Sequence, residues 1–415
     1  MTNWAGNVTY SAATIMRPAS VEELQEIVIA AAGSGRRVGV VGSRHSFNRI
    51  ADTDGVLIDT VSLDSIELDP ERGAVWVGAG VRYATLGPLL DAAGLALHNL
   101  PSAPRITIAG AVATATHGSG DRNRGLADSV DAVELVTADG ELRQISRGDL
   151  DFEGAVVSLG ALGVVARLHL RTEPAFEVAQ AVYRGLPLVR TTTHLDEITS
   201  LAHSVSLFTD WRSGMFDQVW LKRRTDRDRD LPTDILGAIP ATEPCHPVPG
   251  GDAEACTEQL DRPGPWHERL AHFRTDAVPS VGEELQSEYF VDRLCGPAAM
   301  EAVAGASEAF ADLLYVSEVR SIAADDQWLS TTGERAHLGF HFTWRPDPEV
   351  IEVALPAIES ALSEFSPRPH WGKLSTLDPA TLRARYRRFE TFRSLADRLD
   401  PNHTFRNPML DALLT

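Results

Sequence analysis

The chain has 415 residues, which is longer than one hydrophobic core usually serves. Of these residues 43% are hydrophobic, enough for packed cores. Its formal net charge of −20 would repel nucleic acid and anionic membrane surfaces, so we expect neither as a partner. No signal peptide or membrane-spanning apolar run is visible, and the three cysteines form no CxxC pair. These features predict a two-domain cytoplasmic enzyme without a disulfide framework.

Helix and strand signals alternate through the first hundred residues. Ser20 and Glu23 form a capping box that predicts a helix over 21–32, ended by glycines. Strands are predicted at 38–41, 55–59 and 74–78, and a second helix at 83–93 stops before Gly94. This order indicates an α+β unit.

The predicted strand at 38–41 ends abruptly in small residues around one histidine. Gly42 and Ser43 let the backbone approach a ligand closely while leaving amide donors free. His45 lies at the tip of this turn. The same pattern also occurs at ordinary strand ends, so its interpretation depends on the rest of the chain.

Two further stretches are unusually poor in large side chains. Residues 109–120 would let a large flat ligand lie against the backbone, although 110–116 also suits a helix packed tightly on a sheet. Residues 158–165 lead into a strand that ends near Arg171. None of the three stretches carries GxGxxG or a phosphate-loop signature, which counts against nicotinamide and nucleotide triphosphate binding.

Beyond about residue 174 the pattern changes to longer alternating strands, several with polar side chains on one face. Such a face often meets water. The mixture of carboxylate, guanidinium, imidazole and hydroxyl groups fits better the roof of a pocket for a hydroxyl-rich ligand. The pairs, spaced by the two-residue period of a strand, are Ser204 and Ser206, Gln286 and Glu288, Glu318 and Arg320, and His341 and Thr343.

Near the C-terminus, apolar residues at helical spacing from Leu382 to Leu399 predict one closing amphipathic helix.

The remaining patterns count against metal-dependent and hydrolase chemistry. His267 and His272 are five apart, which separates them around a helix, and there is no HExxH motif, so we expect no metal site. The absence of a Gly-x-Ser-x-Gly elbow counts against a hydrolase.

With these residues in view, the chain resembles flavin oxidases of the vanillyl-alcohol-oxidase type, and within them the alditol (xylitol or sorbitol) oxidases. The resemblance runs from Asn3 to Phe405. The chain departs from the family pattern at two places, Arg44 and Asn402-His403, where glycine is common. The motifs that carry the resemblance are Asn3-Trp-Ala-Gly-Asn7, Gly42-Ser-Arg-His-Ser-Phe-Asn48, Ala113-Thr-Ala-Thr-His-Gly-Ser-Gly120, Ser206-Leu-Phe-Thr-Asp-Trp-Arg212, Val219-Trp-Leu-Lys-Arg-Arg-Thr-Asp226, Gly264-Pro-Trp-His-Glu-Arg-Leu270, Glu284-Leu-Gln-Ser-Glu-Tyr289, His341-Phe-Thr-Trp344 and Pro369-His-Trp-Gly-Lys373.

The resemblance implies an α+β fold with two domains. Residues 1–173, completed by 374–415, would form an FAD-binding domain of the PCMH type. Residues 174–373 would form a substrate-binding cap domain on an antiparallel sheet with flanking helices. FAD would be linked covalently through His45 and bound by Val41, Gly42, Ser43, Arg44, His45, Ser46, Ser102, Thr107, Gly110, Ala111, Ala113, Thr114, His117, Val165 and Lys373. Arg44 would either obstruct this loop or pair with a cofactor phosphate.

The same resemblance implies a linear, uncharged polyol as substrate. Its contacts would be Ser102, Gln286, Glu318, Arg320, His341, Thr343 and Lys373, with Lys373, His341, Arg320 and Glu318 as catalytic residues. Lys373 would act either as a base with a lowered pKa or as a hydrogen-bond donor.

We therefore expect an FAD-dependent oxidase that converts the terminal hydroxyl of an alditol to the aldose and reduces dioxygen to hydrogen peroxide. It would work as a monomer. An aldonolactone oxidase or dehydrogenase of the same family is the alternative, although Pro101, next to Ser102, favours an oxidase. A flavin- or sugar-binding protein without turnover is a third possibility, but it would not need Lys373 and His341 together.

Overall fold

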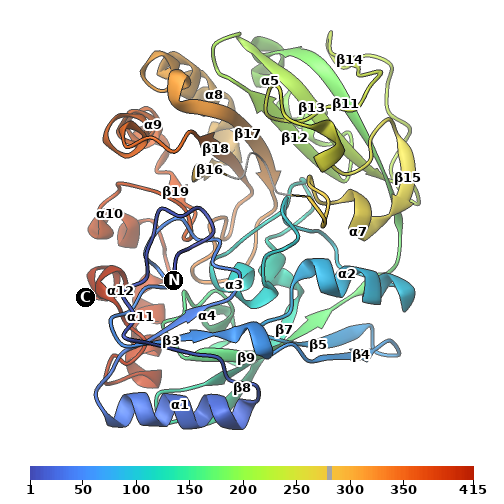
Figure 1. Ribbon diagram of the computed structural model, residues 1–415. Helices are drawn as coiled ribbons and strands as arrows, with labels where there is room; N and C mark the ends of the chain where they lie inside the picture. Colours follow the sequence, from blue (N-terminus) through green and yellow to red (C-terminus); the bar gives the residue numbers. More distant parts are fainter. Residues whose placement is uncertain (278–282) are drawn as a thin grey trace.

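The computed structural model describes residues 1–277 and 283–415, and within them two bodies of sheet lie one above the other (Figure 1). The lower body holds a parallel three-stranded sheet in the order β1 (Thr14–Met16), β3 (Val56–Asp59), β2 (Val38–Val41). Beside it is an antiparallel five-stranded sheet, in the order β4 (Ile66–Asp69), β5 (Ala74–Gly78), β9 (Val164–Arg171), β7 (Val130–Val136), β8 (Leu142–Ser146). A two-stranded ladder joins β6 (Leu95–Ala96) to β10 (Glu173–Pro174).

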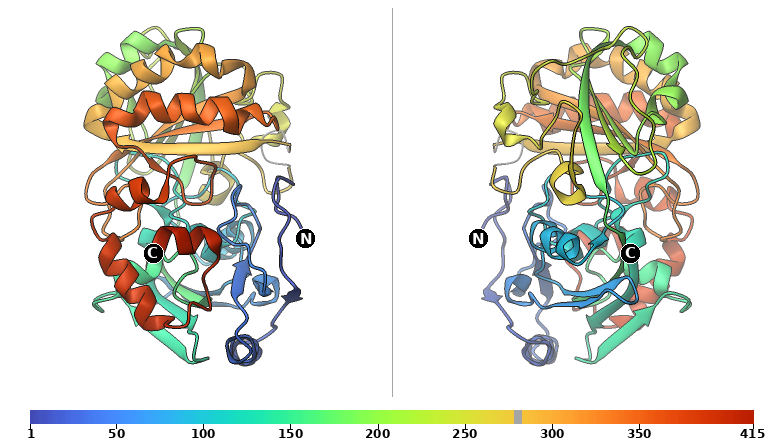
Figure 2. Two further views of the ribbon diagram at one scale, coloured as in Figure 1. Left: turned by 90° about the vertical axis from the view of Figure 1, so that its left-hand side faces the viewer. Right: turned by 90° about the vertical axis from the view of Figure 1, so that its right-hand side faces the viewer.

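The upper body is one nine-stranded antiparallel sheet. Its order is β14 (Ile239–Pro240), β11 (Glu177–Pro187), β13 (Met215–Arg224), β12 (Ser204–Thr209), β17 (Leu314–Ile322), β18 (His337–Trp344), β16 (Leu285–Asp292), β19 (Arg368–Pro369), with β15 (Arg262–Pro265) beside β11. Helices α8 (Gly296–Gly305) and α9 (Leu355–Leu362) cover its outer face, and its other face is turned to the lower body (Figures 1 and 2).

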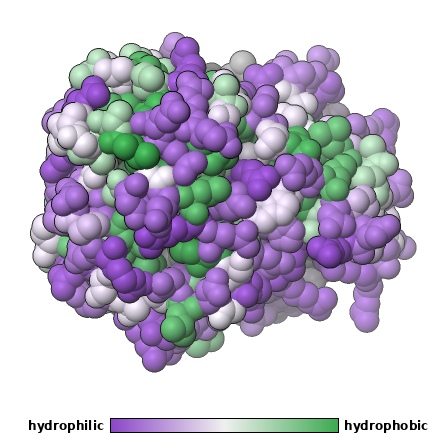
Figure 3. Space-filling model, turned by 90° about the horizontal axis from the view of Figure 1, so that it is seen from below, coloured by the Kyte–Doolittle hydropathy of each residue, from purple (hydrophilic) through white to green (hydrophobic). Residues whose placement is uncertain are grey.

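The other helices divide between the two bodies. Those of the upper body are α5 (Leu188–Thr193), α6 (Leu195–Thr199) and α7 (Trp266–Arg269). Those of the lower body are α1 (Val21–Gly33), α2 (Tyr83–Ala92), α3 (Ile108–Ala113), α4 (Phe152–Val156), α10 (Pro379–Ala384), α11 (Phe389–Leu399) and α12 (Pro408–Leu414). The underside of the lower body is mainly hydrophilic, with apolar patches between (Figure 3).

The local signals at the start of the chain produce the predicted elements. The Ser20 side chain accepts a hydrogen bond from the Glu23 amide, and the Glu23 carboxylate accepts one from the Ala19 amide at 2.7 Å. The second bond therefore lies one residue before its usual place in a capping box. Gly94 follows α2 with a φ of 74°, a left-handed conformation that glycine adopts without strain.

The C-terminal region returns to the lower body. Phe392, Leu395 and Leu410 are buried in the same hydrophobic core as the five-stranded sheet. The predicted helix over 382–399 is wrong as a single element, because it divides into α10 and α11 with a break at residues 385–388. The domain limits at 173/174 and 373/374 stay a prediction.

A buried carboxylate lies in the loop between β17 and β18. Asp325 is 2% exposed, and its Oδ2 accepts hydrogen bonds from Ser330 at 2.6 Å and Thr332 at 2.8 Å. Its Oδ1 has no partner among the described residues. Burial raises the pKa of Asp325 to about 6, so the folded state favours the protonated form.

This raised pKa predicts a specific pH dependence of stability. Between about pH 4 and pH 6 the folded protein keeps the proton that the unfolded chain has lost, so this group's stabilising contribution falls as pH rises. Asp325→Asn should remove this slope and increase the free energy of unfolding at pH 7.5 by roughly 2 kcal/mol. Chemical denaturation of both proteins at pH 4.5 and 7.5 measures it. Equal pH slopes for the two proteins would contradict the prediction.

Candidate functional site

A single cavity between the two bodies is lined by every site residue predicted from the sequence. The loop after β2 and helix α3 form its lower wall, and β12, β16, β17 and β18 form its roof. The roles of these residues stay predictions. What the structure establishes is that residues from six of the nine motifs, distant in sequence, meet at one place.

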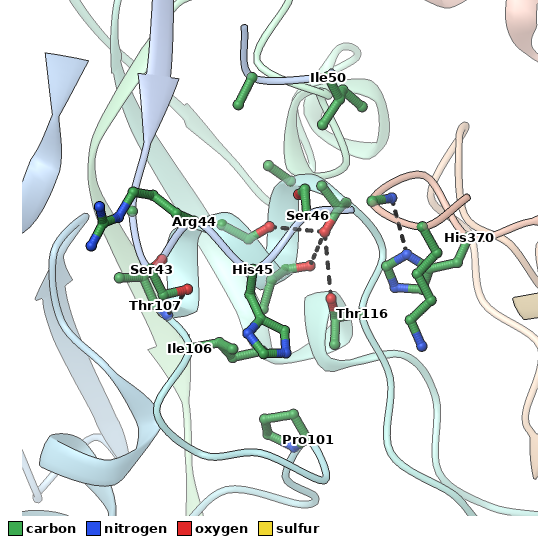
Figure 4. A pocket seen from close by; sticks show the side chains of 18 of the residues that line it. Ser43, Arg44, His45, Ser46, Ile50, Pro101, Ile106, Thr107, Thr116 and His370 are labelled. Carbon is green, nitrogen blue, oxygen red and sulfur yellow. Dashed lines mark hydrogen bonds between the residues drawn. The ribbon is translucent and has the colours of Figure 1, made fainter. Parts of the chain in front are cut away.

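The loop that carries His45 approaches its neighbours very closely. A Cβ on Gly42 would lie 2.1 Å from Thr107 Oγ1, so only glycine fits. The imidazole of His45 points into the cavity near Ile106 and Pro101 (Figure 4). Burial, together with the nearby Lys373 charge, lowers the pKa of His45 to about 4, so this imidazole is neutral at pH 7.

Both departures from the family's glycine pattern coincide with left-handed backbone. The φ angle is 59° at Arg44 and 57° at His403. The exposed side chain of Arg44 points away from His45, and its NH1 donates to Thr2 O at 3.4 Å (Figure 4). The side chain does not obstruct the imidazole. The consequence of arginine at this position is that a residue with a side chain adopts a left-handed conformation that glycine would adopt without strain.

Arg44→Gly should therefore increase the free energy of unfolding by up to about 1 kcal/mol, because it removes left-handed strain that exceeds the entropic cost of glycine. The control is Arg36→Gly, at an exposed position without a positive φ, which should lose stability instead. Chemical denaturation of the two variants measures the difference. A loss of stability in both would show that Arg44 is not strained.

Strand pairing places the polar groups of the roof side by side. His341 of β18 lies opposite Glu288 of β16 on one side and Glu318 of β17 on the other. Arg320 lies opposite Ser206 of β12. These polar side chains are mostly buried. Glu288, Glu318, Arg320, His341 and Thr343 are buried and line the cavity, as the pocket interpretation predicts, and Gln286 lines it partly exposed. Ser204 and Ser206 are buried but do not line the cavity.

Glu288 is the centre of this cluster, with 0% exposure. Its Oε1 accepts from Arg320 at 2.8 Å and lies 3.1 Å from His117 Nε2, and its Oε2 accepts from Lys373 Nζ at 2.6 Å. Burial would raise the pKa of Glu288, but Lys373, His117 and Arg320 hold it well below its usual value. A fully buried carboxylate thus joins side chains from both bodies.

Lys373 has two acceptors on the side of the roof. Its Nζ lies 2.6 Å from Glu288 Oε2 and 2.9 Å from His341 Nδ1. Burial lowers the pKa of Lys373, against the opposing effect of Glu288. Burial and the Lys373 charge also lower the pKa of His341 to about 3, so its imidazole is neutral, and its Nε2 lies 3.2 Å from Thr343 Oγ1.

Glu318 is held from two sides. Its Oε1 accepts from His272 Nε2 at 2.9 Å, and its Oε2 lies 3.5 Å from Arg320 Nε. Burial would raise the pKa of Glu318, but Arg320 and His272 keep it below its usual value. The NH1 of Arg320 also donates to Ser102 Oγ at 3.3 Å, and Gln286 Nε2 donates to Glu284 Oε1 at 2.6 Å.

Sequence reasoning missed several residues of the site. Glu288 was noted for its alternation with Gln286 but was not placed among the site residues. His272 was considered only as a metal ligand with His267, and its place in a loop gave no periodic signal. The lining residues that were not predicted include Phe208, Val248, His272, Phe273, Glu284, Glu288, Val316 and His370.

The lower wall fits an extended phosphorylated cofactor. Thr107 Oγ1 lines the cavity, is buried and has no hydrogen-bond partner among residues 1–277 and 283–415. Hydroxyl groups of Ser43, Ser46 and Thr114 line the same wall, where they provide uncharged donors for phosphate oxygens. Gly42, Gly110, Ala111 and Ala113 line the cavity between them, and residues this small leave the backbone accessible to a flat ring.

Comparisons with known proteins agree with this geometry. The FAD binding domain family matches residues 12–146, and the D-arabinono-1,4-lactone oxidase family matches residues 283–413. Alditol oxidase from a Streptomyces species is 50% identical over 100% of this chain and 99% of its own. This chain belongs to the alditol oxidase family. The resemblance to vanillyl-alcohol-oxidase-type flavin oxidases is thereby confirmed.

More distant relatives agree with the family assignment. L-gulono-1,4-lactone dehydrogenase from Mycobacterium tuberculosis is 31% identical over 98% of this chain and 96% of its own length. Cholesterol oxidase from B. sterolicum shares the fold at a TM-score of 0.80 and 15% identity, covering 100% of this chain and 96% of its own. The predicted α+β flavin oxidase fold is confirmed. No helix within the described ranges of this alditol oxidase family member is long and apolar enough to cross a membrane.

Proposed function

We propose that this protein is an FAD-dependent alditol oxidase that oxidises the terminal hydroxyl of linear polyols, such as xylitol and sorbitol, to the aldose. One observation carries the proposal: the roof presents buried carboxylate, guanidinium, imidazole and hydroxyl groups in a row over the cavity that contains His45. Bound FAD supplies the acceptor for the hydride of the carbinol carbon and transfers both electrons to dioxygen, giving hydrogen peroxide. The 50% identity to alditol oxidase supports this activity.

The cofactor would be held by the lower wall. Backbone and hydroxyl donors of residues 42–46 and 107–114 would bind the pyrophosphate. His45 would hold the cofactor covalently through one imidazole nitrogen. The low pKa of His45, about 4, supports this role because it keeps the imidazole neutral and nucleophilic at pH 7.

The roof would hold the polyol. Glu318, fixed by His272 and Arg320, would accept hydrogen bonds from inner hydroxyls, and Ser102, Gln286 and Thr343 would provide neutral partners. Lys373 Nζ would receive the proton of the reacting hydroxyl. Two of the three free directions around its nitrogen point to Glu288 and His341, so the third is left for the substrate oxygen.

An aldonolactone oxidase or dehydrogenase remains the second candidate, because L-gulono-1,4-lactone dehydrogenase is 31% identical over nearly the whole chain. A linear polyol suits the extended row of paired acceptors and donors better, since a cyclic lactone offers fewer hydroxyl groups to it. The sequence-based expectation of a cytoplasmic monomer belongs to the same proposal.

The test is anaerobic reduction of the flavin by a panel of alditols and aldonolactones, followed by admission of air. Xylitol and sorbitol should bleach the flavin, and peroxide should appear with air. Glycerol should be much poorer, because each lost hydroxyl leaves a buried site group unpaired at roughly 1 to 3 kcal/mol. Faster bleaching by lactones would favour the second candidate, and bleaching that persists in air would indicate a dehydrogenase.

A further inference from the structure

The segment of residues 1–10, here called the N-terminal strap, lies against the loop that carries His45. The strap folds back on itself: Asn3 N–H donates to Val8 O at 2.9 Å, and Tyr10 N–H donates to Met1 O at 3.0 Å. Asn3 is 5% exposed, and its side-chain Oδ1 also accepts from the Val8 amide at 3.0 Å. This compact turn includes the motif Asn3-Trp-Ala-Gly-Asn7, to which the proposed function gives no role.

Donors of the strap bind the backbone on both sides of His45. Each bond ends on a carbonyl within two residues of the histidine. The bonds are Trp4 N–H to Arg44 O at 2.8 Å, Asn3 Nδ2 to Ser46 O at 2.9 Å, and Asn7 Nδ2 to Phe47 O at 2.8 Å. The bond to Arg44 O is one of the contacts that hold Arg44 in its left-handed conformation.

The strap also contacts the imidazole itself. The ring centroids of Trp4 and His45 are 4.4 Å apart with an interplanar angle of 41°, and Phe47 packs edge-on against His45 at 5.8 Å. The half-buried indole therefore limits the directions that the imidazole can take. On the opposite side of the loop, Phe47 N–H donates to Gly372 O at 2.7 Å.

We propose that Trp4 is a positioning residue for flavin attachment: the N-terminal strap holds His45 in the orientation in which its nitrogen meets the cofactor. The inference rests on the proposed covalent link. Attachment replaces the imidazole N–H and one C–H of the flavin 8α-methyl group by a C–N bond. The two electrons and two protons that are released pass to the flavin ring and then to dioxygen, the second substrate of the proposed oxidase.

The test measures the share of flavin that stays with the chain after acid precipitation, together with the total flavin bound to the native protein. Trp4→Ala should bind FAD but attach it roughly 10- to 100-fold more slowly than the wild type when incubated with added FAD in air, the usual penalty for lost orientation. Trp4→Phe, which keeps a ring against His45, should recover most of the attachment. Thr9→Ala, at an exposed position of the same strap, is the matched control and should behave as wild type.

The outcomes separate the two proposals. Wild-type protein that releases all its flavin on denaturation would overturn the covalent link and the role of Trp4 with it. Attached flavin in the wild type, with an unchanged attachment rate in Trp4→Ala, would overturn the role of Trp4 alone. If Trp4→Ala does not fold, the same measurement on Asn3→Ala tests the strap, because this variant removes the bond to Ser46 O together with the side-chain bonds to Asn7 and Val8 that shape the strap. An unchanged rate in Asn3→Ala would then overturn the strap's role.

Discussion

Glu288→Gln is expected to lower kcat/KM for a polyol by about 100-fold or more and to destabilise the fold by roughly 3 to 5 kcal/mol. The amide keeps the shape of the side chain but removes the charge that faces Lys373 at 2.6 Å and Arg320 at 2.8 Å. Both cations are then left buried without their shared counter-charge, which costs far more than the loss of an exposed ion pair. Steady-state kinetics and chemical denaturation measure the two effects.

The matched control is Asp292→Asn on the same strand. Asp292 pairs with Arg335 at 2.9 Å, and the Arg335 side chain is 74% exposed, so water screens the pair; the second contact of Asp292, a hydrogen bond accepted from the Leu294 amide, can be kept by asparagine. Its removal should change stability by less than about 1 kcal/mol and leave turnover unchanged. Near-normal kinetics for Glu288→Gln would show that the buried carboxylate is not needed to organise the site.

Local signals predicted the frame of the site because they depend on residues close in sequence. The valine run before Gly42 stops where the strand stops, and the Ser20 cap fixes the start of α1. The two-residue alternation correctly placed Glu318, Arg320, His341 and Thr343 on the cavity side of their strands. The family resemblance added the expectation that these faces lie over a cofactor.

The central position of Glu288 could not be predicted from the sequence, because it depends on which strands are neighbours in the sheet. Strands β16 and β17 both pair with β18, and this order brings Glu288 and Glu318 to opposite sides of His341. Nothing local specifies that order. His272 reaches Glu318 from a loop, where no periodicity marks the direction of a side chain.

At the C-terminus the helical periodicity was correct, but the single long helix predicted from it was wrong, because the segment forms two shorter helices. Leu382, Tyr386 and Phe389 are all buried, as the pattern requires. Tertiary contacts interrupt the helix between them: Tyr386 stacks on Trp371 at 4.9 Å, and Arg368 Nε donates to Arg385 O at 3.0 Å. The carbonyl of Arg385, the first residue of the break, accepts this bond from Arg368, and a side chain that bonds to a helix carbonyl can interrupt the helix at that point.

Replacement of Lys373 should have the largest effect on turnover. Lys373→Met keeps the length of the side chain but removes the nitrogen that meets the reacting hydroxyl, so kcat should fall by roughly 100- to 10,000-fold, the usual range for a lost acid or base. Flavin binding should remain, because the other residues predicted to bind FAD, which form the lower wall, are intact. Stability should change less than in Glu288→Gln, because removing a buried cation relieves its desolvation while Glu288 keeps Arg320 as a partner.

The pH profile of the wild type decides how Lys373 acts. Burial lowers the pKa of Lys373, which brings its neutral amine closer to physiological pH. The amine's two hydrogens are directed to Glu288 and His341, and its lone pair is then left for the substrate. If this amine takes the hydroxyl proton, kcat/KM should rise with pH and level off above the lowered pKa, and this rise should be absent from the residual activity of Lys373→Met. A kcat/KM that falls over the same pH range would instead identify the ammonium form as the active one, with Lys373 donating a hydrogen bond to the substrate oxygen.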